Sequence, residues 1–159
     1  MACDAIARLY DVDEDSAVFK KLQKTEKYDQ GTFTFRARKG KLIDLDKLHE
    51  SVWATRLSGG TRSGLVSLEV TAVGHIVSSN GATVLKVADS DAEFVIDRQA
   101  DEKKADVFSQ LQNVSSDKVV KLTGVIDNYT GHWPNLLQKE PPKPRRILVN
   151  SFEVVERSQ

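Results

Sequence analysis

The clearest pattern along the chain is a strict alternation of apolar and polar residues over residues 32–38. Phe33, Phe35 and Ala37 fall on one side of this segment, and threonine or arginine residues fall on the other. A period of two is typical of a strand with one buried face. The sequence therefore predicts a strand here, and we interpret the two phenylalanines as core residues rather than as a base-stacking pair.

Two segments beside this strand have the features of helices. Residues 11–27 begin with Asp11 as a candidate N-cap and Glu14 three residues later, and lysines follow, a polarity that complements the helix dipole. Residues 45–57 follow Asp44, a second candidate N-cap, and carry leucine and valine side chains along one face. The sequence predicts a helix in each segment.

The character of the chain changes after residues 58–64, a stretch rich in glycine and serine that predicts a linker or a long loop. Beyond it, β-rich segments are separated by turn residues, among them the hairpin-forming pair Asn80-Gly81. The predicted strands are residues 65–77, 83–88, 93–97, 118–127 and 147–155. Gly74 predicts a bulge or bend in the first strand, and residues 105–113 predict a short helix between the third and fourth strands.

Three strands, a short helix and two further strands follow the element order of the OB fold. Residues from about 65 to 155 resemble OB-fold binding proteins in this order and spacing. We therefore expect an α+β protein whose residues 65–157 form a five-stranded OB-like β-barrel, with a short helix between strands three and four. Residues 1–60 would be a small α+β domain or a decoration of the barrel, in the form of a small ferredoxin-like α/β segment. The resemblance implies a binding role, because OB folds bind oligonucleotides and oligosaccharides.

The order predicted for residues 1–60 resembles part of a ferredoxin-like fold, and also the heavy-metal-associated domains. Members of that family bind metal through two cysteines in a Met-x-Cys-x-x-Cys loop. The chain begins Met1-Ala2-Cys3-Asp4-Ala5-Ile6, so Cys3 matches the first cysteine, but Ile6 stands at the second position. One thiolate does not make a soft-metal site, so we expect no metal and no cofactor.

Composition narrows the class of protein. The 159 residues include 23 lysines and arginines and 23 aspartates and glutamates, so the formal net charge is zero, and 40% of the residues are hydrophobic. These values are typical of a globular domain and exclude a strongly basic coat for nucleic acid. The sequence shows neither an apolar run long enough to span a membrane nor a signal peptide, which predicts a soluble, cytoplasmic protein. The single cysteine allows no internal disulfide.

Most candidate binding residues lie in residues 128–146, the connection between the last two predicted strands. In an OB fold this loop contacts the ligand. It combines aromatic rings, each worth about 1–3 kcal/mol when stacked on a base, with cations that attract phosphate. Two lysines on the predicted strands extend the set. The candidate ligand-binding residues are Tyr129, His132, Trp133, Lys139, Lys143, Arg145, Arg146, Lys121 and Lys86.

Two interpretations of this loop stay open. Its aromatic residues bind single-stranded nucleic acid or another oligomeric anion, or they fold back on the barrel while the basic residues keep the loop soluble. Glu93 and Asp97 should point outward from the third barrel strand and oppose the first interpretation, because carboxylates repel phosphate. The alternative function is a protein-interaction or scaffold module that uses the barrel rim and the proline-rich residues 141–144.

No motif in the chain predicts catalysis. His49, His75 and His132 lie in three different segments, and none has a histidine or carboxylate at the spacing of a known catalytic or metal-binding motif. We therefore expect a protein that is not an enzyme, unless an active site forms from residues that are distant in sequence. The sequence does not determine the oligomeric state.

Overall fold

The structure is a computed structural model of the 159-residue chain, and it describes Ile6 and residues 11–24, 29–55, 67–127 and 145–156. The chain divides into two compact units, Met1–Leu65 (unit 1) and Val66–Gln159 (unit 2). The named elements of the described residues are mostly strands, with the two helices α2 and α3, which confirms the α+β class.

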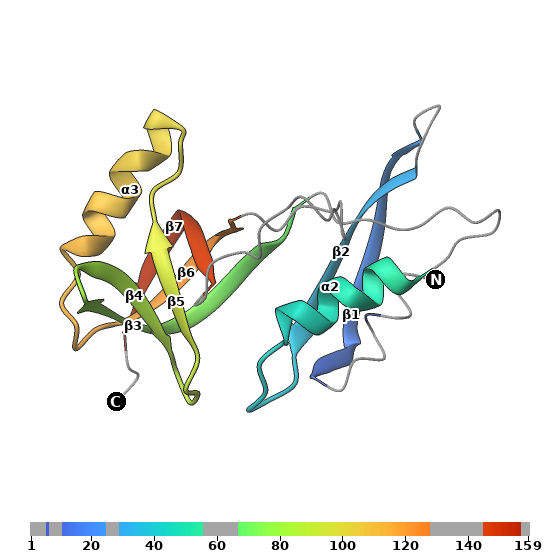
Figure 1. The fold of residues 1–159 in the computed structure, drawn as a ribbon, viewed down its shortest axis with the longest axis horizontal. Coiled ribbons are helices and arrows are strands. Elements are labelled where there is room, and N and C mark those ends of the chain that lie inside the picture. The colour runs from blue at the N-terminus through green and yellow to red at the C-terminus, as the bar shows by residue number, and fades with distance from the viewer. Residues whose placement is uncertain (1–5, 7–10, 25–28, 56–66, 128–144, 157–159) are drawn as a thin grey trace. The chain divides into compact units, whose positions relative to one another are not determined.

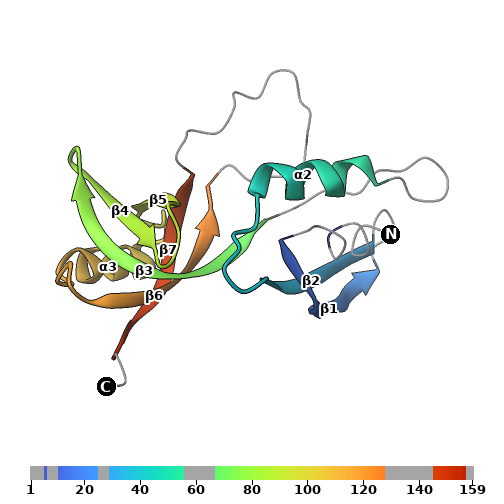
Figure 2. The ribbon, with the colours of Figure 1, turned by 90° about the horizontal axis from the view of Figure 1, so that it is seen from below.

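The elements of unit 1 with described bounds are an antiparallel strand pair and a helix. The strands are β1 (Val12–Lys24) and β2 (Asp29–Ala37), and the helix is α2 (Leu45–Ala54). Figures 1 and 2 show α2 across one face of the strand pair. The rings of Phe33 and Phe35 are paired, with centroids 5.2 Å apart. The strand predicted for residues 32–38 is confirmed, since β2 includes residues 32–37.

The helix predicted for residues 11–27 is wrong, because Val12–Lys24 of this segment form the strand β1. Its polar start is a bulge rather than a first helical turn, since the register between β1 and β2 shifts after Asp13. The hydroxyl of Ser16 donates to the carbonyl of Asp13 at 2.6 Å and accepts the backbone N–H of Arg36 at 2.8 Å. The order β1-β2-α2 replaces the helix–strand–helix order from which a ferredoxin-like segment was predicted.

The second predicted helix is confirmed as α2. The carboxylate of Asp44 accepts the backbone N–H groups of Asp46 and Lys47 at 3.0 and 3.1 Å, so Asp44 is the predicted N-cap. Leu48 and Val52 are only 1% and 3% exposed. These two residues supply the buried face of the helix.

The described strands of unit 2 close into a barrel in the order β3-β4-β5-β7-β6. They are β3 (Glu69–Ser79), β4 (Ala82–Val87), β5 (Glu93–Asp97), β6 (Val119–Ile126) and β7 (Arg146–Val155). Helix α3 (Glu102–Gln112) stands between β5 and β6 in the chain. Neighbouring strands are antiparallel, except that β5 and β7 run parallel. The five predicted strands and the predicted helix are confirmed, with ends that differ by four residues or fewer.

The core of unit 2 is formed by residues that alternate along the strands and by one face of α3. Phe108 and Leu111 of α3 are 7% and 0% exposed. The side-chain amide of Gln112 donates to the hydroxyl of Thr83 on β4 at 3.2 Å. The buried aliphatic residues of the strands are Ile76, Val84, Leu85, Ile96, Val120, Leu122, Ile126, Ile147 and Val149. At the predicted hairpin, Asn80 and Gly81 adopt φ angles of 51° and 77°, as a tight primed turn requires.

Gly74 lies where β3 changes its pairing partner. Residues before Gly74 pair with β6 alone, and residues after His75 pair with β4 alone. Figure 2 shows the strong curvature of β3. A Cβ atom on Gly74 would lie 2.0 Å from the carbonyl oxygen of Lys86, which leaves no room for a side chain. The predicted feature is thus a bend, and the register shift in this sheet lies between Thr123 and Gly124, in the pairing of β6 with β7.

We expect the substitution Gly74→Ala to destabilise unit 2 by about 3 kcal/mol, because the added methyl group must displace backbone. The matched control is Gly81→Ala, where a Cβ atom meets no atom within 4 Å but φ is 77°. The control substitution should lower the free energy of unfolding by about 1–2 kcal/mol, through the unfavourable backbone angle alone. Urea unfolding followed by circular dichroism gives both values. A cost for Gly74→Ala no larger than that of the control would contradict the close approach.

Candidate binding surface of the barrel

The structure describes only part of the predicted site. Lys86, Lys121, Arg145 and Arg146 belong to the described residues, at positions on β4, on β6 and at the start of β7. The predictions for the remaining candidates fall outside the described residues: Tyr129, His132, Trp133, Lys139 and Lys143. The geometry below therefore concerns the barrel strands.

Strand β5 presents a carboxylate to each of its two neighbouring strands. Glu93 Oε1 lies 3.5 Å from Lys86 Nζ on β4, and Asp97 Oδ2 lies 3.2 Å from Arg146 Nη1 on β7. Ile96, between them in sequence, is 2% exposed. Glu93 and Asp97 therefore lie on the outer face of the barrel, as predicted, and each holds a candidate cation.

Lys121 belongs to a different part of the outer surface. It lies opposite Glu153 in the pairing of β6 with β7, and its Nζ is 3.2 Å from Glu153 Oε1. On its other side it lies opposite Val73 of β3. The structure thus places Lys86 and Arg146 on the two sides of β5, and it does not bring Lys121 between them.

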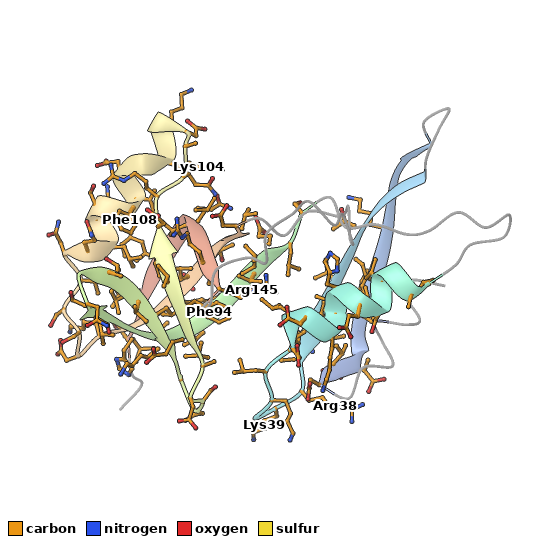
Figure 3. All side chains as sticks on the ribbon, in the orientation of Figure 1. Arg38, Lys39, Phe94, Lys104, Phe108 and Arg145 are labelled. Carbon is orange, nitrogen blue, oxygen red and sulfur yellow. The ribbon has the colours of Figure 1, made fainter. Side chains whose placement is uncertain are left out.

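Arg145 and Arg146 are placed by the parallel pairing of β5 with β7. The carbonyl of Arg145 accepts the backbone N–H of Val95 at 3.0 Å, and Val95 lies opposite Arg146 in the register. Figure 3 shows Arg145 and Phe94 in one region of the barrel, apart from Lys104 on α3. The side chain of Arg146 is 39% exposed, but its Nε atom is buried without a hydrogen-bond partner.

For the described residues Lys86, Lys121 and Arg146, the electrostatic result is three ion pairs rather than a basic patch. Lys86, Lys121 and Arg146 each face one carboxylate. Their side chains are 39% to 56% exposed, so each pair contributes only about 0.2–1 kcal/mol to stability. Ion pairs this weak add little to the stability of unit 2.

A polar cluster near the start of α3 was not predicted. The side-chain amide of Gln99 donates to the carbonyl of Leu148 at 3.1 Å and to Asn150 Oδ1 at 2.7 Å. Asn150 also accepts from Lys104 Nζ and donates to Glu69 Oε2, both at 3.3 Å. These residues come from three distant segments and carry no local motif, so the sequence offers no signal for the cluster.

His75 makes a structural contact rather than a recognisable catalytic pair. Its Nδ1 atom lies 3.1 Å from the carbonyl oxygen of Lys118. In the same turn, the hydroxyl of Ser115 donates to the carboxylate of Asp117. This hydrogen bond is the main cause that lowers the pKa of Asp117 below its ordinary value, and the nearby charges of Lys118 and His75 add to it.

We expect Ser115→Ala to raise the pKa of Asp117 toward its ordinary value, because the carboxylate loses its main hydrogen-bond donor. A folded-state pKa below the unfolded value stabilises the fold above that unfolded value, and this contribution is lost as the pH falls through the folded pKa. The measurement is an NMR pH titration of the Asp117 carboxyl carbon. An unchanged pKa in the variant would show that the hydroxyl is not the cause.

Unit 1 holds an open depression of about 420 Å³ lined by Asp13, Asp15, Arg38 and Lys39. Figure 3 shows Arg38 and Lys39 close to each other on that unit. The described lining residues are two acids and two bases, which balance one another and favour neither an anion nor a cation. Across the described ranges, no group of three or more histidine, cysteine, aspartate or glutamate side chains could hold a metal ion.

Comparison with known proteins gives no relative for this chain. No family model matches the sequence, and no curated protein or solved structure matches it significantly. Among the helices that the structure describes, none has the length and apolar character needed to span a membrane. Any assignment of function therefore depends on the fold and on the surface described above.

Proposed function

We propose that unit 2 is an OB-like binding module for single-stranded nucleic acid or another oligomeric anion. The observation that carries this proposal is the closure of the barrel. The first strand of the unit, β3, pairs with both β4 and β6, and the fifth, β7, runs parallel to the third, β5. A helix stands between the third and fourth strands. A five-stranded barrel with this element order is the architecture of OB folds.

In an OB fold, the ligand lies on the second and third strands. The corresponding strands here are β4 and β5, and Lys86 lies on the outer face of β4. On the other side of β5, Arg146 of β7 lies beside Asp97. The connection between β6 and β7 corresponds to the loop that contacts ligand in OB folds. Its sequence supplies the candidate rings and cations predicted above.

The balance of charge on this face determines how such a module binds. Because the barrel cations are paired with carboxylates, long-range attraction of a polyanion is weak. Stacking of bases on Tyr129 and Trp133 would then supply most of the affinity, at about 1–3 kcal/mol per base. Such a module would bind in the range of non-specific complexes, with a Kd of about 1–100 μM.

The test is fluorescence anisotropy with a labelled oligothymidine of about 15 nucleotides at low salt, a length within the site sizes of OB folds. We expect Trp133→Ala to weaken binding by about 1–3 kcal/mol because one stacking surface is lost. The matched control is Lys103→Ala on α3, which removes one exposed cation from another part of unit 2. No binding of DNA or of the matching RNA would reject the proposal, and so would equal effects of the two substitutions.

The second candidate function is a protein-interaction or scaffold module, and exposed aliphatic residues favour it. Val73, Val154 and Val155 are 38%, 45% and 37% exposed on β3 and β7. Scattered apolar residues of this kind are common on protein surfaces, so they weigh less than the barrel topology. Light scattering after size exclusion and a pulldown that resists nuclease would support this function. A strict monomer with no protein partner would argue against it.

A further inference from the structure

The pairing of Arg146 with Asp97 carries an inference that rests on the proposed function and makes it more specific. We propose that Asp97 sets the affinity of the binding face for a phosphate ligand. Its carboxylate holds Arg146 in the ligand-free protein, and a phosphate of single-stranded nucleic acid replaces it on binding. Asp97 thus acts as an internal competitor for the ligand.

The contact geometry leaves one edge of the guanidinium unused. Asp97 Oδ2 contacts Nη1 of Arg146 at 3.2 Å, a single contact rather than a two-pronged one. Nη2 and Nε form the other edge, whose parallel N–H groups match two oxygens of a phosphate. Among the described residues, no hydrogen bond or ion pair joins this edge to another group.

The buried Nε atom explains why the exchange is favourable. A buried N–H group without a partner is destabilising, so the resting position of Arg146 is not its best one. Because Nε is covered in this position, the side chain must turn outward before both N–H groups can reach a ligand. In the proposed exchange, this movement replaces the contact with Asp97 by a bidentate phosphate, which restores the lost charge pairing and also satisfies Nε.

Asp97 itself loses little when Arg146 leaves. Its second oxygen, Oδ1, accepts the backbone N–H of Arg98 at 2.8 Å, so the carboxylate stays in place with one hydrogen bond. Its side chain is 41% exposed, so water can solvate the oxygen that Arg146 releases. Lys86 and Glu93 differ from this pair, because the flexible ammonium group of a lysine can contact two anions at once without leaving its partner.

The experiment compares Asp97→Asn with a charge-matched control in the oligothymidine assay. Asparagine keeps an oxygen for the N–H of Arg98 but removes the negative charge that faces Arg146. The control is Glu156→Gln, an exposed carboxylate beyond the far end of β7. We expect Asp97→Asn to tighten binding about two- to fivefold relative to the control, the range of a partly exposed ion pair.

Two further readouts separate exchange from a general charge effect. In the wild type, the freed Asp97 carboxylate would take up part of the cation that the bound phosphate releases, and Asp97→Asn removes this uptake, so the slope of log K against log salt should steepen by up to about 0.7. In an Arg146→Gln background, Asp97→Asn should give no more gain than Glu156→Gln. Equal gains from both carboxylate substitutions, or a gain that persists without Arg146, would overturn the exchange while the proposed function stands. Binding by none of the variants would overturn both.

Discussion

The structure of unit 2 depends on two places where strands approach too closely for a side chain. At Gly74, a Cβ atom would lie 2.0 Å from the carbonyl of Lys86, and at Gly124 it would lie 2.5 Å from both Ile147 Cγ2 and the carbonyl of Leu148. Gly74 lets β3 bend from β6 to β4, and Gly124 lies at the register shift between β6 and β7. Because the strands lie so close together at these two glycines, a sheet of only five strands can curl far enough for β5 and β7 to meet.

Closure in turn creates the candidate surface. β5 and β7 meet over only three residue pairs, from Val95–Arg146 to Asp97–Leu148. This short parallel contact is what brings Arg146 to Asp97, which lies 49 positions earlier in the chain. An open sheet with the same strands would leave both side chains without this partner. The ion pair is therefore a product of the topology and not of any local motif.

The barrel strands could be predicted from the sequence because local signals agree there with the final structure. Alternating residues mark β5, and the Asn80-Gly81 turn separates β3 from β4 with the φ angles that this pair favours. β1 could not be predicted because its local signals conflict with the structure. Its acidic start imitates the first turn of a helix, whereas the contact that forms the bulge joins Ser16 to Arg36, 20 residues away.

The same limit applies to the candidate site. Alternation along β5 correctly predicts that Glu93 and Asp97 face outward, because the period of two is a local property. Their partners depend on strand register: β4 places Lys86 opposite Glu93, and the parallel β7 brings Arg146 to Asp97. Sequence reasoning could name these cations as candidates for a binding surface but could not show that each would already hold a carboxylate.

Paired cations and a neutral chain are compatible with anion binding when the pairs are weak. A strongly basic face binds any polyanion, and its affinity is set mainly by salt. A face on which each cation already has a carboxylate must exchange one partner for another, so the attraction between charges largely cancels. The difference in affinity between one ligand and another then comes from contact geometry and from stacking, which depend on how well a ligand fits. The zero net charge of this chain therefore argues against a protein that coats nucleic acid through charge alone.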